Sequence, residues 1–380
     1  MIKKILYTLI TLSFVAVTLL YVSGYGYIIT SIDRTYLAGN LTANINDHSE
    51  FNTNVIKTNK PQALTKHAKY NTKSLPIKFV ETLKSSKTAA FLVLKDGQVL
   101  SEHYFNGYTD RSKTNSFSMS KTVTTLLLGI AIKEGYIRDL DQPISDFLPE
   151  FKNDPIGATV TVAQLSLMNS GYDWDEQYYS PFSPTVELYY GDNVSNFLRK
   201  RSFTEPAGTF WEYSSASTEL LGLFLLRALQ KNNAAQTLSG YLSEKIWQPM
   251  NMNDDALWHT DEQGIELAFC CINTNARNYA KLGLLMQNKG QWAGQQIVPA
   301  DFISKMIQPL GQQYYGMSTW LGLHKSPAHY WFSGHLGQFI INLQEHNITI
   351  VRLGETSPKG KEHLDDLIPW FIDGALSLIQ

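Results

Sequence analysis

The pattern of apolar and polar positions divides the chain into three parts. Residues 5–22 form one continuous apolar run, and no charged residue follows Lys4 before Asp33. Residues 33–75 are rich in Asn, Thr and Lys without sustained periodicity, which is typical of a polar tether. From residue 76 to residue 380, short apolar runs and helical patterns follow one another, so this part is expected to form the folded domain.

The first 32 residues predict a membrane anchor or a signal segment. Lys3 and Lys4 precede the apolar run 5–22, which is long enough to cross a bilayer. Basic residues stay on the cytoplasmic side, so the domain is expected on the extracytoplasmic, periplasmic side of the inner (cytoplasmic) membrane. An uncleaved anchor is favoured because the charge-free stretch is longer than a usual signal core. Cleavage near Val22-Ser23-Gly24, followed by secretion, is the alternative.

Strand patterns lie at both ends of the domain, and helical patterns lie between them. Apolar runs over 89–94 and 99–105 flank an Asp-Gly pair, which is a strong signal for a hairpin. A second pair of strands is expected over 339–343 and 348–353. Helices are expected over 116–134, 161–168, 217–229, 274–286 and 364–378.

This order of elements predicts an α/β fold of the α+β kind. Its mixed, antiparallel sheet is expected to combine N- and C-terminal segments of the domain, with helices flanking it. The helical middle, roughly residues 136–268, is expected to form an inserted lobe. A functional site is expected where this lobe meets the sheet.

Composition narrows the classes of protein to consider. The chain has 380 residues, of which 43% are hydrophobic, and a net charge of −2, so neither a nucleic-acid partner nor a polybasic membrane surface is predicted. The cysteines, Cys270 and Cys271, are adjacent and badly placed for an ordinary disulfide. They are expected to be small buried side chains, since a lone pair also lacks a zinc-ligand pattern.

Ser118 and Lys121 are the strongest candidates for chemistry. They stand three residues apart at the start of the most hydrophobic helix, so their side chains share a face. Backbone N–H groups near a helix N-terminus lack partners and favour developing negative charge at Ser118. A serine needs a proton acceptor to become a nucleophile at neutral pH, and a desolvated Lys121 is one. This S-x-x-K match is the only one in the chain.

With this motif in place, residues from about 89 to 353 resemble the serine beta-lactamase and penicillin-binding-protein superfamily, which uses S-x-x-K as one of its motifs. Residues 160–165 and 169–174 resemble the family's following helix and "SG" loop. The closer likeness is to class C beta-lactamase-related proteins, carboxylesterases of that fold and 6-aminohexanoate-dimer hydrolases. The resemblance implies a beta-lactamase/transpeptidase-like fold and an enzyme that needs no metal or organic cofactor.

The resemblance also implies roles for residues that would not stand out otherwise. Tyr213-Ser214-Ser215 corresponds to the second motif, in which Tyr213 takes a proton from Ser118 and returns it to the leaving group, and Ser215 contacts substrate. Such a tyrosinate needs neighbouring positive charge, which Lys121 supplies. Without the family, packing is the default role for Tyr213.

His335-Leu336-Gly337 corresponds to the third motif, usually K-T-G. Gly337 lets substrate approach the strand edge, and the backbone N–H groups of Ser118 and Gln338 would form the oxyanion hole. His335 replaces the lysine that binds the carboxylate of beta-lactam and D-Ala-D-Ala substrates. A histidine is mostly neutral at pH 7, which favours less specialised esters or amides over antibiotics.

An aromatic and acidic loop, 172–179, lies between the first two motifs. It is expected either to cover the site or to pack as a surface loop, with Trp174 and Tyr178 as candidate substrate contacts.

Taken together, the residues predict a serine hydrolase that cleaves an ester or amide through an acyl-enzyme on Ser118, with Lys121 and Tyr213 as proton shuttles. One alternative is a beta-lactamase or D,D-peptidase acting on cell-wall peptides. The other is a non-catalytic descendant that binds peptidoglycan or a partner. An alpha/beta-hydrolase is excluded because the chain has no G-x-S-x-G motif. The expected partners are a small-molecule or short-peptide substrate and, through the N-terminal segment, the membrane.

Overall fold

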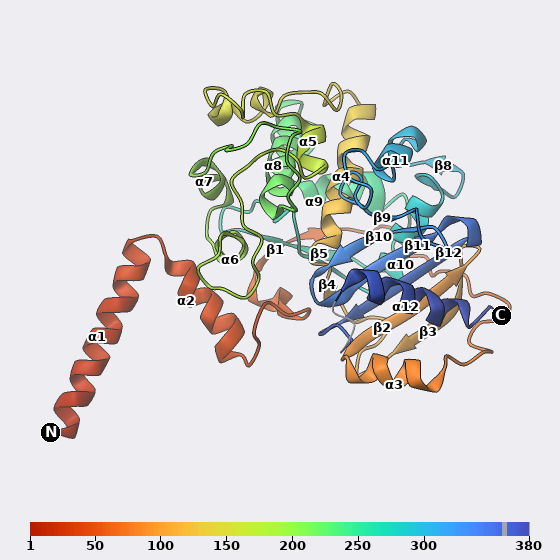
Figure 1. Cartoon of the computed structure of the whole chain (residues 1–380), viewed down its shortest axis with the longest axis horizontal. Coiled ribbons are helices and arrows are strands. Elements are labelled where there is room, and N and C mark those ends of the chain that lie inside the picture. The colour runs from red at the N-terminus through yellow and green to blue at the C-terminus, as the bar shows by residue number, and fades with distance from the viewer. Residues whose placement is uncertain (359–362, 380) are drawn as a thin grey trace.

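The computed structural model describes residues 1–358 and 363–379. Its main element is a six-stranded antiparallel sheet in the order β3-β2-β12-β11-β10-β9 (Figure 1). The strands are β2 Thr88–Lys95, β3 Gln98–Tyr104, β9 Trp320–Gly322, β10 His329–Gly334, β11 Gln338–Leu343 and β12 Ile348–Gly354. The beginning and the end of the domain therefore meet in one sheet, which confirms the predicted fold class.

The predicted hairpin and its turn are confirmed. β2 and β3 pair from Lys95 and Gln98 onward, with Asp96 and Gly97 as the two-residue loop. Both loop residues have left-handed backbone, with φ of 52° and 77°. A tight hairpin with the right-handed twist of its strands requires that conformation at both positions, which is why Asp-Gly is such a reliable signal.

Both faces of the six-stranded sheet are covered, so β2 is buried along almost its whole length. Phe91 and Val93 face an apolar layer that includes residues of α3 (Ile77–Ser85) and α12 (Leu364–Leu376). The alternating residues Ala90, Leu92 and Leu94 join the larger core on the opposite face. On that side α10 (Ala276–Gln287) packs against the sheet.

Helix α4 (Met119–Lys133) runs between the sheet and the helical lobe. It contacts β10 and β11 on one side and α8 (Ser215–Lys231) on the other. Residues 119–131 of α4 are all buried, which agrees with the central position predicted from the apolar stretch 126–132. A helix with so few exposed positions holds its first turn rigidly in the junction between sheet and lobe.

The helices of the lobe have capped N-termini, and all of them except α8 are short. Thr161 and Gln164 form the predicted capping box: the Thr161 hydroxyl accepts from the Gln164 N–H, and the Gln164 side chain accepts from the Thr161 N–H. The lobe helices are α5 Val162–Ser166, α6 Pro184–Tyr190, α7 Val194–Arg199, α8 and α9 Leu238–Leu242, and α11 Ala300–Met306 lies beyond the lobe.

A second antiparallel sheet, in the order β1-β5-β6-β4, lies beside the lobe. Its strands are β1 Asn52–Ile56, β4 Thr114–Asn115, β5 Ala256–Thr260 and β6 Ile272–Thr274, and a separate small ribbon comprises β7 Gln291–Trp292 and β8 Gln295–Gln296. β4 leads directly to the turn that precedes α4, so this sheet fixes the approach of the chain to Ser118.

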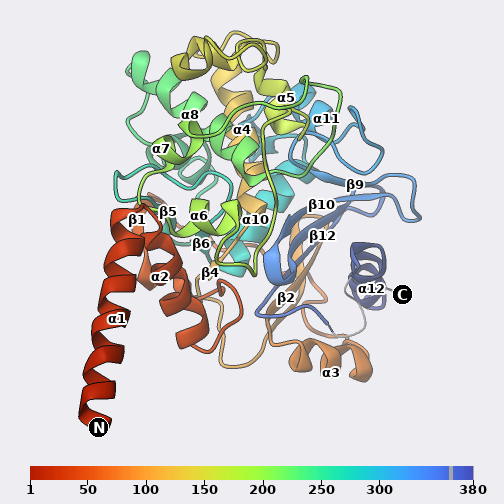
Figure 2. The ribbon, with the colours of Figure 1, turned by 60° about the vertical axis from the view of Figure 1, so that its left-hand side comes forward.

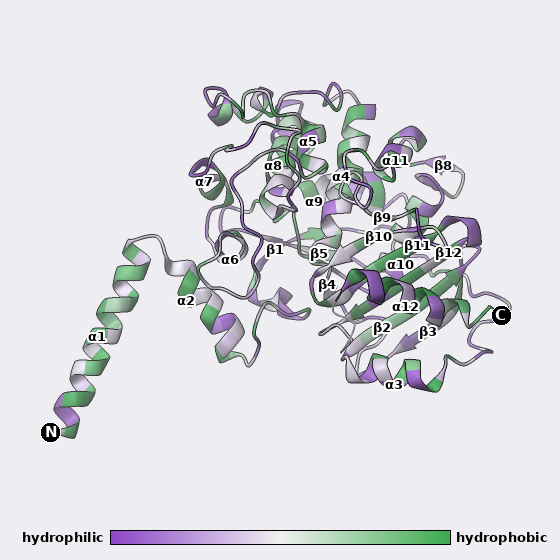
Figure 3. Cartoon of the chain, in the orientation of Figure 1, coloured by the Kyte–Doolittle hydropathy of each residue, from purple (hydrophilic) through white to green (hydrophobic). Residues whose placement is uncertain are grey.

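The N-terminal helix α1 (Ile2–Val22) projects away from the domain, and none of its residues is buried (Figures 1 and 2). Beyond the hydrophilic first turn that holds Lys3 and Lys4 it is mostly apolar (Figure 3), and it is long and apolar enough to cross a membrane. This fits an anchor or a signal sequence equally. Three residues later, α2 (Gly26–Ile32) lies beside α6.

The segment 33–75, predicted to be a polar tether, is instead integrated into the fold. Its strand β1 pairs antiparallel with β5 over five residues of each strand. Ile45 and Ile56 are fully buried, and the buried Asp47 carboxylate accepts hydrogen bonds from Tyr189 and Asn115. The low hydrophobicity of the segment gave no sign of this integration, because β1 contributes mainly backbone hydrogen bonds and the segment buries only a few apolar side chains. The folded part therefore begins well before residue 76.

Candidate active site

Ser118 stands at the N-terminal cap of α4, and Lys121 lies one turn further along. The Lys121 Nζ is 2.9 Å from the Ser118 Oγ. A sharp turn precedes the serine: Phe117 has left-handed backbone, with φ of 44°, and its N–H donates to the Asn115 side chain. An aromatic residue rarely adopts this conformation, and such backbone strain is often found at functional sites. The three-residue spacing thus brings the two side chains together as predicted.

Lys121 is completely enclosed, with 1% of its surface exposed. Its ammonium group donates to three oxygens: the Ser118 Oγ, the Ser215 Oγ at 3.1 Å and the Phe269 carbonyl at 3.1 Å. Burial lowers the pKa of Lys121 to about 8, and the negative charge of Glu176 opposes that shift. A larger fraction of this lysine is therefore neutral at pH 7 than of an exposed lysine.

Glu176 connects Ser215 with the loop that covers the site. Its carboxylate accepts hydrogen bonds from the Ser215 N–H (2.8 Å) and hydroxyl (2.6 Å). It also accepts from the Trp174 indole N–H and, at 2.8 Å, from the Tyr178 hydroxyl. Four donors around one carboxylate hold the loop 174–178 against the start of α8.

Tyr213 lies beside the same lysine, with the Lys121 Nζ 5.0 Å from the centre of its ring. Burial raises the pKa of the Tyr213 phenol far above its ordinary value, and the Glu176 charge raises it further. A hydrogen bond with Ser118 lowers that pKa, but by less. Tyr213 is therefore protonated at neutral pH, which differs from the tyrosinate expected from the family motif.

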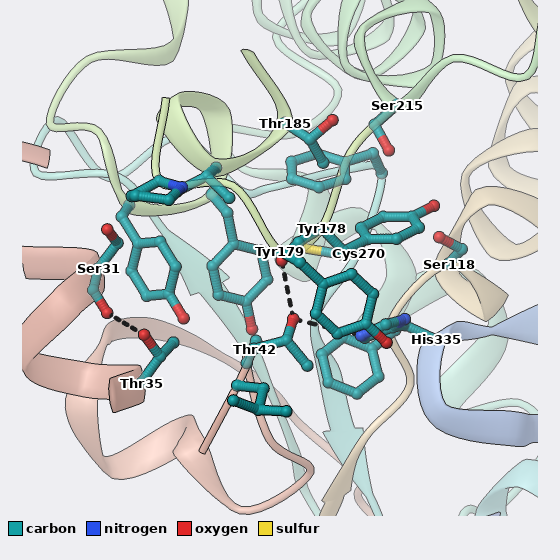
Figure 4. A pocket seen from close by; sticks show the side chains of 18 of the residues that line it. Ser31, Thr35, Thr42, Ser118, Tyr178, Tyr179, Thr185, Ser215, Cys270 and His335 are labelled. Carbon is teal, nitrogen blue, oxygen red and sulfur yellow. Dashed lines mark hydrogen bonds between the residues drawn. The ribbon is translucent and has the colours of Figure 1, made fainter. Parts of the chain in front are cut away.

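A cavity opens beside Ser118, with about 580 Å³ of empty space including its open mouth. Figure 4 shows Ser118, Ser215, Tyr178 and His335 around it. The wall on the far side comes from the N-terminal segment, including Thr42. Segments that are far apart in the sequence therefore enclose one cavity next to the serine.

His335 lies among aromatic rings at the floor of the cavity. Its ring centre is 4.7 Å from that of Tyr178, 5.9 Å from Tyr179 and 5.5 Å from Phe117. Its Nε2 is 3.3 Å from the Thr42 hydroxyl. Burial lowers the pKa of His335 to about 4, so the side chain is neutral at pH 7, as expected. The site therefore lacks the charge that a lysine would place there.

The glycine and glutamine of the third motif have structural partners. Gly337 has φ of 82°, and a side chain there would collide with the buried Arg352 guanidinium, which donates to the Leu336 and Gly337 carbonyls. Packing beneath the motif therefore already requires glycine at this position, and the approach of substrate to Gly337 stays a prediction. The Gln338 side chain bonds to the His335 carbonyl and to both backbone groups of Gly354, which fixes the first residue of β11.

The predicted substrate contact of Trp174 stays a prediction. Trp174 is not among the described residues that line the cavity, and its indole packs edge-on against Phe197, with ring centres 6.1 Å apart. Trp174 therefore supports Glu176 from behind. Tyr178, the other predicted contact, does line the cavity.

Two residues that matter to the geometry were missed by sequence reasoning. Glu176 belongs to the loop that was singled out as acidic, but nothing in its spacing connects it with Ser215. Thr42 lies in the segment taken for a tether, yet its hydroxyl donates to the Tyr178 carbonyl and contacts His335. Both contacts join residues that are distant in sequence, which local pattern does not reveal.

The adjacent cysteines are buried as predicted, but they are joined to each other in a disulfide, which corrects the expectation of free side chains. Cys271 has left-handed backbone, with φ of 78°. Cys270 lines the cavity. Among residues 1–358 and 363–379, no group of three or more His, Cys, Asp or Glu side chains is placed to hold a metal ion.

Fold and site together define a hydrolase with a buried lysine against a serine at a helix N-terminus. The chain belongs to the beta-lactamase family, whose model, described as Beta-lactamase, matches residues 78–369. This confirms the superfamily inferred from the motifs and the assignment as an enzyme related to amidases and esterases.

Individual relatives agree with this. The 6-aminohexanoate-dimer hydrolase of Paenarthrobacter ureafaciens is 26% identical over 241 residues, covering 60% of this chain and 59% of that enzyme. A putative 6-aminohexanoate-dimer hydrolase from Bacillus anthracis superposes with a TM-score of 0.71 at 24% identity, covering 88% and 93% of the two chains. A family VIII carboxylesterase shares the fold, with a TM-score of 0.58 at 16% identity over 80% and 99%.

Proposed function

We propose that this chain is an extracytoplasmic serine hydrolase that cleaves an ester or amide through an acyl-enzyme on Ser118. The observation that carries the proposal is the 2.9 Å contact between the Ser118 hydroxyl and a lysine whose pKa burial lowers to about 8. A buried amine with this pKa is a base suited to neutral pH.

The hydrogen bonds around Lys121 set the direction of proton transfer. The single hydroxyl proton of Ser215 goes to Glu176, so Ser215 only accepts from Lys121, and the Phe269 carbonyl also only accepts. When Lys121 is neutral, its amine has two N–H groups, and these donate to the Ser215 hydroxyl oxygen and the Phe269 carbonyl. Its lone pair then faces the third partner, the Ser118 hydroxyl. Lys121 is thus oriented to take the serine proton.

The reaction then proceeds in two halves. The Ser118 oxygen forms a bond to the substrate carbonyl carbon, and the developing oxyanion is stabilised by the N–H groups of Ser118 and Gln338. The bond to the leaving alcohol or amine breaks, and the leaving group takes a proton from Tyr213, which is recovered from Lys121. Water attacks the acyl-enzyme along the same route in reverse, releasing the acid and restoring Ser118.

The neutral His335 supports this reading over a beta-lactamase or D,D-peptidase. Among the described residues of the third motif, His335 is neutral and offers no positive charge to a substrate carboxylate, and the buried Arg352 beneath the motif donates to backbone carbonyls. The 6-aminohexanoate-dimer hydrolase among the relatives favours an amide as substrate.

Active-site labelling of the purified full chain tests the proposal. A fluorophosphonate is expected to label the native chain and the Ser120→Ala variant, but not Ser118→Ala; Ser120 is a matched control, buried two residues away and bonded to the Ala268 carbonyl. Absence of a Ser118-dependent adduct would support a binding protein instead. A lasting adduct with a fluorescent penicillin would support a penicillin-binding protein, and rapid turnover of it a beta-lactamase.

The extracytoplasmic position rests on α1 and the two lysines at its start. Alkaline phosphatase, which is active only outside the cytoplasm, is expected to be active when fused after residue 380. The placement would be contradicted if this fusion were inactive and a reporter that fluoresces only in the cytoplasm, fused at the same point, were fluorescent.

A further inference from the structure

The segment that follows the membrane helix builds one wall of the catalytic cavity. Tyr36, Leu41, Thr42 and Ala43 line the same space as Ser118. The segment is bound in place: the Tyr36 hydroxyl donates to the Tyr179 carbonyl at 2.8 Å, and the Thr42 hydroxyl to the Tyr178 carbonyl at 3.0 Å. Residues near the membrane therefore help to decide what reaches the serine.

The surface of this cavity is largely apolar. Its lining includes Leu41 and Ala43 of the N-terminal segment, together with Val186 and Phe269. Several lining residues remain exposed at the mouth, with Leu41 at 72% and Tyr179 at 56%. Exposed apolar surface that continues into a cavity beside a nucleophile is suited to an apolar ligand.

The mouth of the cavity also lies close to where α1 ends. Three residues separate α1 from α2, and α2 and the following helical turn Asp33–Leu37 have seven and five residues. At 1.5 Å per residue they span about 18 Å. If α1 lies in a bilayer, the cavity wall is separated from the membrane surface by about the length of these two short helical segments.

We propose that the cavity binds the apolar chain of an amphiphilic ester or amide drawn from the membrane surface. The inference rests on the proposed function and adds the substrate class: an acyl compound with an extended hydrocarbon chain. The chain lies between the 41–43 segment and α6, and the carbonyl carbon faces Ser118. The N-terminal segment is then a specificity-determining element.

Turnover of p-nitrophenyl esters from acetate to octanoate, by the full chain in lipid nanodiscs, tests this. Each buried methylene is worth about a three- to fourfold increase in kcat/KM, so octanoate is expected to exceed acetate by at least tenfold. Leu41→Glu places a charge on the apolar wall and is expected to lower the octanoate-to-acetate ratio at least tenfold.

Leu37→Glu is the matched control, because Leu37 is equally exposed, lies four residues earlier and is not among the described residues that line the cavity. Its ratio is expected to stay within twofold of the native one. Equal ratios in the two variants, or a native chain with no preference for longer esters, would overturn the inference while leaving the hydrolase intact. If the native chain neither reacted with the fluorophosphonate nor hydrolysed the acetate ester, the proposed function itself would be refuted.

Discussion

Glu176 accepts two hydrogen bonds from Ser215, one from its N–H and one from its hydroxyl. Through the second bond it fixes the direction of the contact between Ser215 and Lys121. It also places a negative charge near the ammonium group, which opposes the effect of burial on the Lys121 pKa. One loop carboxylate thereby influences both the orientation and the basicity of the proposed base.

Glu176→Gln is therefore expected to move the pH dependence of the reaction. Without the charge, the pKa of Lys121 falls further below about 8. Because the neutral amine is the active form, the low-pH limb of kcat/KM shifts to lower pH. The measurement is a pH–rate profile with an amide or ester substrate. Glu187→Gln, which removes a carboxylate paired with Arg201, is the control, and an unmoved limb in Glu176→Gln would contradict the proposal.

The protonated state of Tyr213 predicts a dependence on the leaving group. Tyr213→Phe is expected to reduce turnover of an amide by roughly 10²- to 10⁴-fold, because the departing amine loses its proton donor. A p-nitrophenyl ester, whose leaving group needs no proton, is expected to lose less than tenfold. Tyr314→Phe, at a partly exposed neighbouring tyrosine, serves as the control. Equal losses on both substrates would exclude the role as proton donor.

Burial of Lys121 is expected to cost stability in a pH-dependent way. The folded-state pKa of about 8 lies below the ordinary 10.5, so between these values the unfolded chain holds a proton that the folded chain has released. Stability from this group therefore rises with pH across that window. The Lys121→Met variant is expected to gain unfolding free energy relative to the native chain at pH 8. This advantage is expected to shrink by about 3 kcal/mol between pH 8 and pH 10.5, because the native chain becomes more stable.

Thermal or denaturant unfolding at the two pH values measures this difference. Lys133→Met, at an exposed position of the same helix, controls for removing a lysine charge. A Lys121→Met difference that stays constant with pH would show that the lysine is not held with a lowered pKa.

The integration of residues 33–75 predicts contrasting effects of two deletions. A chain lacking residues 2–22 is expected to keep its fold, because α1 buries none of its residues. A chain lacking residues 2–75 loses β1, the Asp47 contacts and one wall of the cavity. Its melting temperature and octanoate turnover are expected to fall well below those of the shorter deletion, as calorimetry and kinetics will measure. Equal values would restore the tether interpretation.

The parts of this molecule that are encoded locally could be predicted from the sequence. The Asp-Gly hairpin, the capping box at Thr161 and the buried helix after Ser118 each depend on residues within a few positions of one another. The same holds for the contact of Ser118 with Lys121 across one helical turn. The order of strand and helix patterns along the domain also predicted that its two ends join one sheet, but not the order of the strands in it.

Features that depend on long-range contacts escaped prediction. The segment 33–75 has the composition of a linker, and its place in the fold comes from backbone pairing with β5, more than 200 residues away. Glu176 reaches Ser215 only because the loop 174–178 folds over α8. The protonation of Tyr213 depends on its burial and on the charge of Glu176, neither of which a motif encodes.

The position of β12 has a consequence for incomplete chains. This strand, the last that the structure describes, lies between β2 and β11 and is paired with both. A chain that stops before residue 348 would leave β2 and β11 with unpaired edges in the middle of what should be one sheet. Such apolar edges template pairing with other chains. Premature termination of translation is therefore expected to yield aggregation-prone fragments rather than a weakened enzyme.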